Sequence, residues 1–119
     1  MATVNKVNVR DIYVHQGATR QFTLKLEDNN EVAKNLTGYT IEMTVRKRAG
    51  GESILELISS GSGITLTGAS GQMDFLMTAA QTADFDFVEG VYDVKLTSGA
   101  GTVVYILRGK IIVTRRVTT

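Results

Sequence analysis

The sequence predicts an all-β domain, built as an antiparallel sandwich or barrel of about eight short strands. Apolar and polar residues alternate with period two in several stretches, and turn-forming residues separate these stretches at short intervals. The composition also favours strands, because Thr and Val are plentiful. Pro is absent and Gly numbers 12, so turns must be made by Gly, Asn, Asp and Ser. Alternation of this kind gives each sheet one dry face, and two sheets bury these faces against each other.

A length of 119 residues predicts a single domain that covers residues 1–119. Within it, we expect residues 1–15 to form an N-terminal strand or arm and residues 114–119 to form a polar tail. The net charge of +1 does not indicate a nucleic-acid surface. No apolar run reaches the ~20 residues of a membrane span, so no membrane contact is predicted. The first residues lack the apolar core of a signal peptide, so we expect a protein made in the cytoplasm.

Residues 90–113 carry the clearest local pattern, which predicts an antiparallel hairpin. Two arms with alternating apolar residues stand on either side of the small residues Ser98-Gly99-Ala100-Gly101. The residues expected to point into the core are Tyr92, Val94 and Leu96 on the first arm and Val103, Tyr105, Leu107, Ile111 and Val113 on the second. The two arms should therefore be neighbouring strands of one sheet.

The N-terminal segment has apolar pairs at Val7 and Val9 and at Ile12 and Val14, and the phase slips by one residue between the pairs. The slip indicates one of two arrangements. A bulge would keep both pairs on one face of a sheet. Alternatively, the segment is an edge strand that leaves one sheet and joins the other.

Further strands are expected between these two regions. Their approximate ranges are residues 19–27, 39–46, 53–58, 64–66 and 72–77. The residues predicted to point inward are Phe22, Leu24, Leu26, Tyr39, Ile41, Met43, Val45, Met73, Phe75 and Met77. Turns are expected at residues 15–18, 28–31, 35–38, 47–52, 59–63 and 68–71, which are rich in residues that favour turns.

One short helical turn is predicted over residues 78–85. Thr78 can cap it, and Gln81 stands three residues later, as a capping box requires. The segment is too short to be stable by itself, so we expect it to cross an edge of a sheet.

No group of residues has the types and spacing of a catalytic or metal-binding set. The absence of Cys excludes disulfides and thiolate metal sites. His15, the one histidine, lies in a predicted turn without identifiable partners. Asp84, Asp86 and Glu89 are acidic neighbours that lack the ligand spacing of a calcium loop. We therefore predict no enzyme activity, no cofactor, no metal and no small-molecule substrate.

Several turn motifs resemble those of a group of phage and prophage virion proteins. The motifs are Gln16-Gly17-Ala18-Thr19, Asn35-Leu36-Thr37-Gly38-Tyr39, Gly63-Ile64-Thr65-Leu66, Thr82-Ala83, Gly90-Val91-Tyr92-Asp93-Val94 and Gly101-Thr102-Val103. Over residues 16–113, the chain is similar to the N-terminal domain of siphophage upper baseplate proteins. This resemblance implies an immunoglobulin-like sandwich that docks a receptor-binding part onto the phage tail.

The resemblance implies a non-enzymatic structural protein of the virion that contacts other virion proteins and copies of itself. Proteins of that group continue into a coiled coil or a receptor-binding region, whereas this chain ends at Thr119. We therefore expect a stand-alone tail, baseplate, collar or fibre-adaptor subunit. A capsid decoration (cement) protein is the nearest alternative. A carbohydrate-binding module is a further alternative, for which only Tyr13, Phe85 and Phe87 are expected to be free for stacking on a sugar.

The second arm of the hairpin is apolar on both faces, although a sandwich strand needs only one dry face. Either a loop or the N-terminal segment shields the outward residues, or Val104, Ile106 and Ile112 line a subunit interface. Arg46 and Arg48 belong to a local basic cluster without interleaved aromatics, which favours a protein contact or a solvated face over nucleic acid. We predict an interface formed by these five residues.

Overall fold

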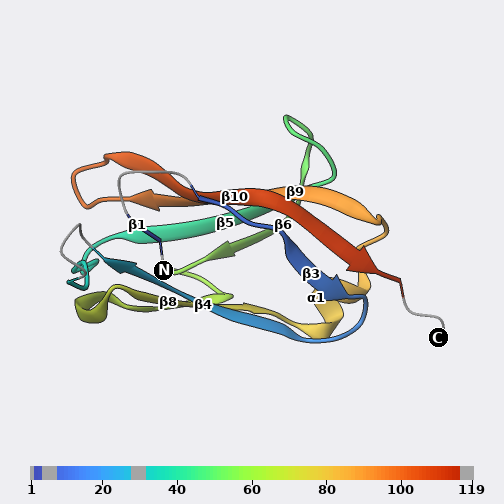
Figure 1. Ribbon diagram of the computed structural model, residues 1–119, viewed down its shortest axis with the longest axis horizontal. Helices are drawn as coiled ribbons and strands as arrows, with labels where there is room; N and C mark the ends of the chain where they lie inside the picture. Colours follow the sequence, from blue (N-terminus) through green and yellow to red (C-terminus); the bar gives the residue numbers. More distant parts are fainter. Residues whose placement is uncertain (1, 4–7, 28–31, 116–119) are drawn as a thin grey trace.

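The computed structural model describes residues 2–3, 8–27 and 32–115 of the chain. Two β-sheets stack face to face, so the protein is a β-sandwich (Figure 1). The predicted all-β fold is confirmed, and the barrel alternative is wrong because the strands form two separate sheets. The predicted turn at residues 28–31 and the end of the predicted tail lie outside the described residues.

The first sheet has four strands in the order β1, β4, β8 and β7. Their bounds are Ala2–Thr3 for β1, Arg20–Glu27 for β4, Gln72–Met77 for β8 and Ile64–Thr67 for β7. β4 pairs antiparallel with β8 and places Phe22 opposite Phe75, and the two rings stack with their centroids 4.6 Å apart. β1 pairs parallel with β4 at the edge of this sheet.

The second sheet has the order β2, β10, β9, β5 and β6, and β3 also pairs with β10. Their bounds are Asn8–Val9 for β2, Ile12–His15 for β3, Thr40–Arg46 for β5, Ser53–Ile58 for β6, Glu89–Thr97 for β9 and Val103–Thr114 for β10. β9 and β10 pair antiparallel, which confirms the predicted hairpin. β2 and β3 pair parallel with β10.

These strand orders are those of an immunoglobulin sandwich. In that fold, the first, second, fifth and fourth strands form one sheet, and the last two strands pair with the third in the other. Here β1, β4, β8 and β7 correspond to the first sheet, and β10, β9 and β5 correspond to the second. The predicted immunoglobulin-like topology is therefore confirmed.

The N-terminal strands belong to both sheets, because β1 pairs in the first sheet while β2 and β3 pair in the second. This confirms the alternative in which an edge segment leaves one sheet and joins the other. Ile12 and Val14 enter the core, but Val9 is 69% exposed, so the bulge that would keep both apolar pairs on one face is wrong. Val7 lies outside the described residues.

The core between the sheets contains most of the residues that the alternation predicts to point inward. Those buried are Leu24, Leu26, Ile41, Met43, Val45, Met73, Phe75, Met77, Tyr92, Val94, Leu96, Leu107, Ile111 and Val113. Phe22 and Tyr39 pack against this core and are half-buried. Side chains from both sheets thus form one apolar layer, as expected for two stacked amphipathic sheets.

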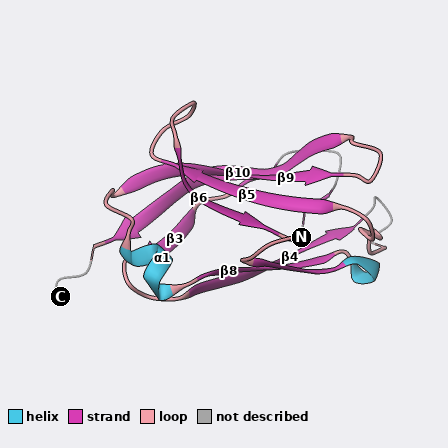
Figure 2. Cartoon of the chain, turned by 180° about the vertical axis from the view of Figure 1, so that it is seen from behind, coloured by secondary structure: helices cyan, strands magenta, loops and turns pink. Residues whose placement is uncertain are grey.

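The predicted helical turn is α1 (Ala79–Ala83), which lies at the end of the sandwich where β10 finishes (Figure 2). Thr78 and Gln81 form the predicted capping box. The amide of Gln81 donates to Thr78 Oγ1 at 3.1 Å, and the amide of Thr78 donates to Gln81 Oε1 at 2.8 Å. A 3-10 helix, η1 (Gly68–Ser70), occupies the place where a plain turn was expected.

Thr82 ties α1 to the turn that follows β3. Its buried hydroxyl donates to the Ala18 carbonyl at 2.8 Å and accepts from the Gly17 amide at 3.0 Å. Gln16 Nε2 adds a hydrogen bond to the Phe85 carbonyl at 3.0 Å. Two of the motif segments therefore contact each other and fasten one end of the sandwich.

Within residues 2–3, 8–27 and 32–115, none of the helices has the length and apolar composition that a bilayer crossing requires.

Candidate functional site

A β-bulge in β10 determines which side chains of this strand reach the surface. The register pairs Tyr105 with Lys95 and Leu107 with Val94, so Ile106 has no partner of its own on β9. One extra residue reverses the alternation on the far side of the bulge. Ile106 consequently enters the core and is 0% exposed, whereas Tyr105 is 47% exposed.

The predicted facing of four residues on β10 is therefore wrong. Ile106, expected to point outward, is buried, and Val103 and Tyr105, expected to point inward, are exposed. Val104, also expected to point outward, pairs with the core residue Leu96 and so stands on the inner side of the sheet, although it is 39% exposed at the end of the hairpin.

The other three predicted interface residues are found in different places. Ile112 points outward as expected, and it is half-buried beside Tyr13 of β3. Arg46 is half-buried at the end of β5, where its Nε donates to the Gly51 carbonyl at 3.0 Å. Arg48 is exposed in the loop between β5 and β6, which projects from the second sheet on the side away from the first (Figure 1).

The outer face of the first sheet is polar, and side chains on it form hydrogen bonds with one another. Thr23 Oγ1 donates to Asp74 Oδ1 at 2.6 Å, and Gln72 Nε2 donates to Asp74 Oδ2 at 3.1 Å. These two hydrogen bonds hold the pKa of the Asp74 carboxyl below its ordinary value, and the bond from Thr23 has the larger effect. Leu76 is the large apolar side chain exposed on this face among the described residues. Such a surface is well suited to solvent.

The outer face of the second sheet differs, because apolar and aromatic side chains gather over β2, β3, β9 and β10. We call this surface the β10 face. Its residues are Val9, Tyr13, Val91, Asp93, Val103, Tyr105, Arg108 and Ile112. Tyr13 is 63% exposed, as the sequence predicts, and exposed apolar side chains gathered on one face are typical of contact sites.

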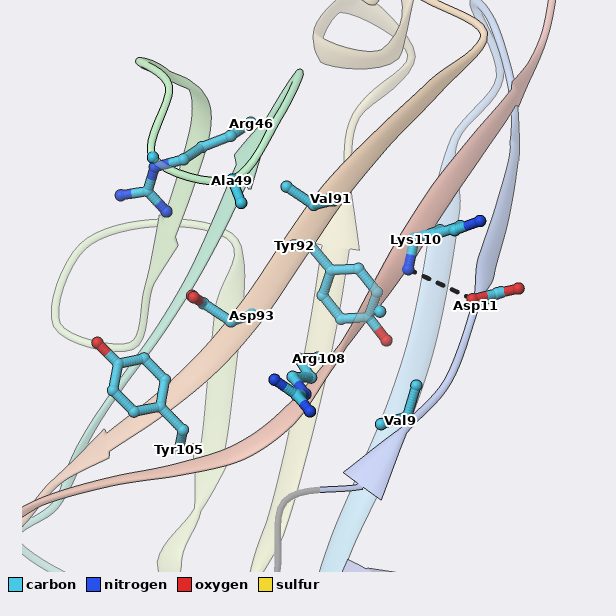
Figure 3. Close-up of a pocket in the computed structure, with 12 residues that line it drawn as sticks. Val9, Asp11, Arg46, Ala49, Val91, Tyr92, Asp93, Tyr105, Arg108 and Lys110 are labelled. Carbon is cyan, nitrogen blue, oxygen red and sulfur yellow. Dashed lines mark hydrogen bonds between the residues drawn. The ribbon is translucent and has the colours of Figure 1, made fainter.

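A groove of about 750 Å³ is hollowed into the β10 face (Figure 3). Val9 and Asp11 line one border, and the loop between β5 and β6 contributes Ala49 and Gly50 to the other. Tyr105 and Val91 line it from β10 and β9. The groove therefore combines apolar walls with an exposed aromatic ring.

Tyr92 and Gly109 hold the N-terminal border of this groove in place. The Tyr92 hydroxyl donates to the Arg10 carbonyl at 2.6 Å, and the Arg10 amide donates to the Arg108 carbonyl at 2.9 Å. Gly109 is required here because a Cβ at this position would overlap the Arg10 carbonyl oxygen. Burial raises the pKa of the Tyr92 phenol to about 12.

Five charged residues line the groove, and most have partners. Lys110 Nζ lies 3.6 Å from Glu89 Oε2, and the Lys110 amide donates to Asp11 Oδ1 at 3.3 Å. Arg46 bonds to a backbone carbonyl, as described above. Arg108 and Asp93 stand opposite each other on β10 and β9, yet neither side chain bonds to another described residue.

The sequence did not indicate Tyr105, Asp93 or Arg108 as site residues. Asp93 and Arg108 are charged residues within the apolar arms of the hairpin, and this interruption of the pattern could have indicated them as site residues. Counting back from the loop in a regular hairpin, however, pairs Arg108 with Tyr92 instead of Asp93. Only the bulge brings Arg108 and Asp93 into register.

Phe85 and Phe87, which were expected to be free for a sugar ligand, are buried, with Phe85 1% exposed. Their rings lie 5.3 Å apart between centroids. They follow α1 and close one end of the sandwich, so they belong to the core. That prediction is wrong.

His15 ends β3 at the surface. Among the residues that the structure describes, no three His, Asp or Glu side chains gather as a metal site would require.

No family model matches the sequence, and no curated protein matches it. The fold is similar to that of the N-terminal domain of ORF48 of phage TP901-1, with a TM-score of 0.61 and 11% sequence identity. The match covers 94% of this chain and 92% of that domain. The resemblance to the N-terminal domain of a phage protein, predicted from turn motifs, is therefore confirmed at the level of the fold.

Proposed function

We propose that this protein is a non-enzymatic structural subunit of a phage particle, in which the β10 face is the surface that contacts a neighbouring virion subunit. The fold similarity to a phage protein domain and the turn motifs support a place in a particle. The motif resemblance favours a tail, baseplate, collar or fibre-adaptor position.

The difference between the two outer faces carries the docking part of this proposal. The first sheet exposes a hydrogen-bonded polar surface, whereas the second exposes Tyr13, Val103 and Tyr105. Covering apolar surface contributes roughly 25 cal/mol per Å². Tyr side chains are also frequent among the residues that dominate binding energy. A partner on the β10 face would gain from both effects.

The location is tested by mass spectrometry of gradient-purified particles whose heads and tails have been separated. We expect the protein in the tail fraction. Recovery with heads would identify a capsid decoration subunit instead. Absence from both fractions would show that the protein is not part of the particle.

The docking face is tested by a matched pair of variants. Tyr105→Asp places a charge on the β10 face, and Gln21→Asp places the same charge on the exposed outer face of the first sheet. We expect the first variant to be lost from particles and the second to be retained, with both folded by circular dichroism. Equal incorporation of the two variants would argue against docking through the β10 face.

The carbohydrate-binding alternative has less support, because Phe85 and Phe87 are in the core. Tyr13 and Tyr105 are the exposed tyrosines of the β10 face. A glycan array with the wild-type protein and with Tyr105→Ala tests this alternative. Binding that Tyr105→Ala abolishes would favour it over protein docking.

A further inference from the structure

Arg108 and Asp93 form an unusual pair on the β10 face. They are directly opposite on neighbouring antiparallel strands, where side chains are close enough to interact. Neither side chain bonds to any residue among those described. The adjacent cross-strand charges do pair: Lys95 lies 3.7 Å from Glu42 on the same side of the sheet.

The surroundings of this pair are those of a contact site. Arg108, Asp93 and Tyr105 all line the groove, and Figure 3 shows their side chains projecting from β9 and β10 on one side of the sheet. Val91 adds apolar surface next to Asp93. A guanidinium and a carboxylate that have no bonding partner among the described residues therefore share one concave surface with an exposed ring.

This combination is complementary to itself. In a two-fold symmetric interface, both subunits present the same patch, so the patch must match its own rotated copy. A patch with one unpaired cation and one unpaired anion can do so, because each cation meets the anion of the other subunit. A purely basic or purely acidic patch would repel its copy. The net charge of +1 keeps repulsion between whole molecules small.

We infer that the partner on the β10 face is a second copy of this chain. The two β10 faces pack about a two-fold axis, with Arg108 of each copy bonded to Asp93 of the other. Tyr105 packs into the groove of the opposite copy. Arginine and carboxylate form two parallel hydrogen bonds, which set orientation as well as strength. This inference rests on the proposed function insofar as that function makes the β10 face a contact surface.

The test measures sedimentation velocity over a concentration series for the wild type, for Arg108→Asp and for Asp93→Arg. We expect the wild type to dimerise. Each variant should self-associate on the order of 100-fold more weakly, because like charges then face each other across the interface.

Mixing the two variants provides the decisive measurement. In the mixed dimer, the two carboxylates of the Arg108→Asp chain meet the two guanidiniums of the Asp93→Arg chain. Association should therefore return in the mixture to near the wild-type level. Mixing cannot relieve repulsion within one chain, so recovery cannot come from a repaired fold.

Lys25→Asp is the matched control, because it changes the charge equally on the exposed outer face of the first sheet. It should dimerise like the wild type. A monomeric wild type, dimers that persist in both single variants, or a mixture that stays monomeric would each overturn the inference. The particle experiment is independent, so a monomer found in tails would leave the proposed function standing.

Discussion

At the scale of single residues, Tyr92 shows how one side chain joins distant parts of the chain. Its ring is in the core, and its hydroxyl reaches the Arg10 carbonyl, 82 residues away in sequence. Gly109 lets that carbonyl approach, since any Cβ would displace it. The Gly-x-Tyr motif that suggested a phage resemblance therefore has a structural role, which is to hold the N-terminal segment on β10.

The pKa of Tyr92 predicts a pH effect. Burial favours the neutral phenol and raises its pKa to about 12 from an ordinary value of 10.0. The contribution of the neutral Tyr92 phenol to the free energy of unfolding is therefore fully present below pH 10 and is lost as the pH rises toward 12. Urea unfolding at a series of alkaline pH values should show this loss in the wild type and a smaller one in Tyr92→Phe. The same slope in both proteins would contradict the assignment.

At the scale of elements, β10 has the most consequential irregularity. Its bulge allows one strand to bury Ile106 and Leu107 next to each other while turning Tyr105 to the surface. β10 pairs with three strands, with β9 along one edge and with β2 and β3 along the other. The bulge therefore separates a core-building part of β10 from the part that contributes Tyr105 to the groove.

The bulge predicts opposite outcomes for neighbouring substitutions. Ile106→Asp would bury an unpaired charge and should cost on the order of 4 kcal/mol of unfolding free energy or more. Tyr105→Asp lies at the surface and should change that free energy by less than about 1 kcal/mol. Urea titrations of both variants measure the difference. The reverse ranking would mean that β10 pairs in a regular register.

At the scale of the whole molecule, the two sheets share one core and should unfold together. Leu24 lies in the first sheet and Tyr92 in the second, and both belong to the same buried cluster. A domain of this size commonly unfolds in a single cooperative transition. A substitution that destabilises the first sheet should therefore lower the unfolding midpoint of the second sheet as well.

Leu24→Ala tests whether the two sheets unfold together. The substitution should lower the unfolding free energy by about 2–5 kcal/mol through lost burial and an unfilled cavity. Tyrosine fluorescence and far-UV circular dichroism should report the same midpoint in urea. A near-zero loss would contradict the burial of Leu24, and two separate midpoints would contradict a shared core.

Much of the fold could be predicted from local patterns. Alternation located the strands that form the core, Thr78 and Gln81 marked the helix start, and four small residues located the hairpin loop. These features depend on interactions within a few residues, so the local sequence contains their causes. The stretch Val103-Val104-Tyr105-Ile106-Leu107 is different, because an apolar residue at every position fits either facing equally well.

Pairing between distant strands decided what the local pattern left open. β9 fixed the register that buries Ile106, exposes Tyr105 and sets Arg108 opposite Asp93. Likewise, Phe85 and Phe87 are buried in the core because the chain that follows α1 places them at the end of the sandwich. The sequence by itself thus determined the sandwich and its motifs. The β10 face was decided by tertiary structure, because which side of a two-sided apolar strand is buried depends on the neighbours that cover it.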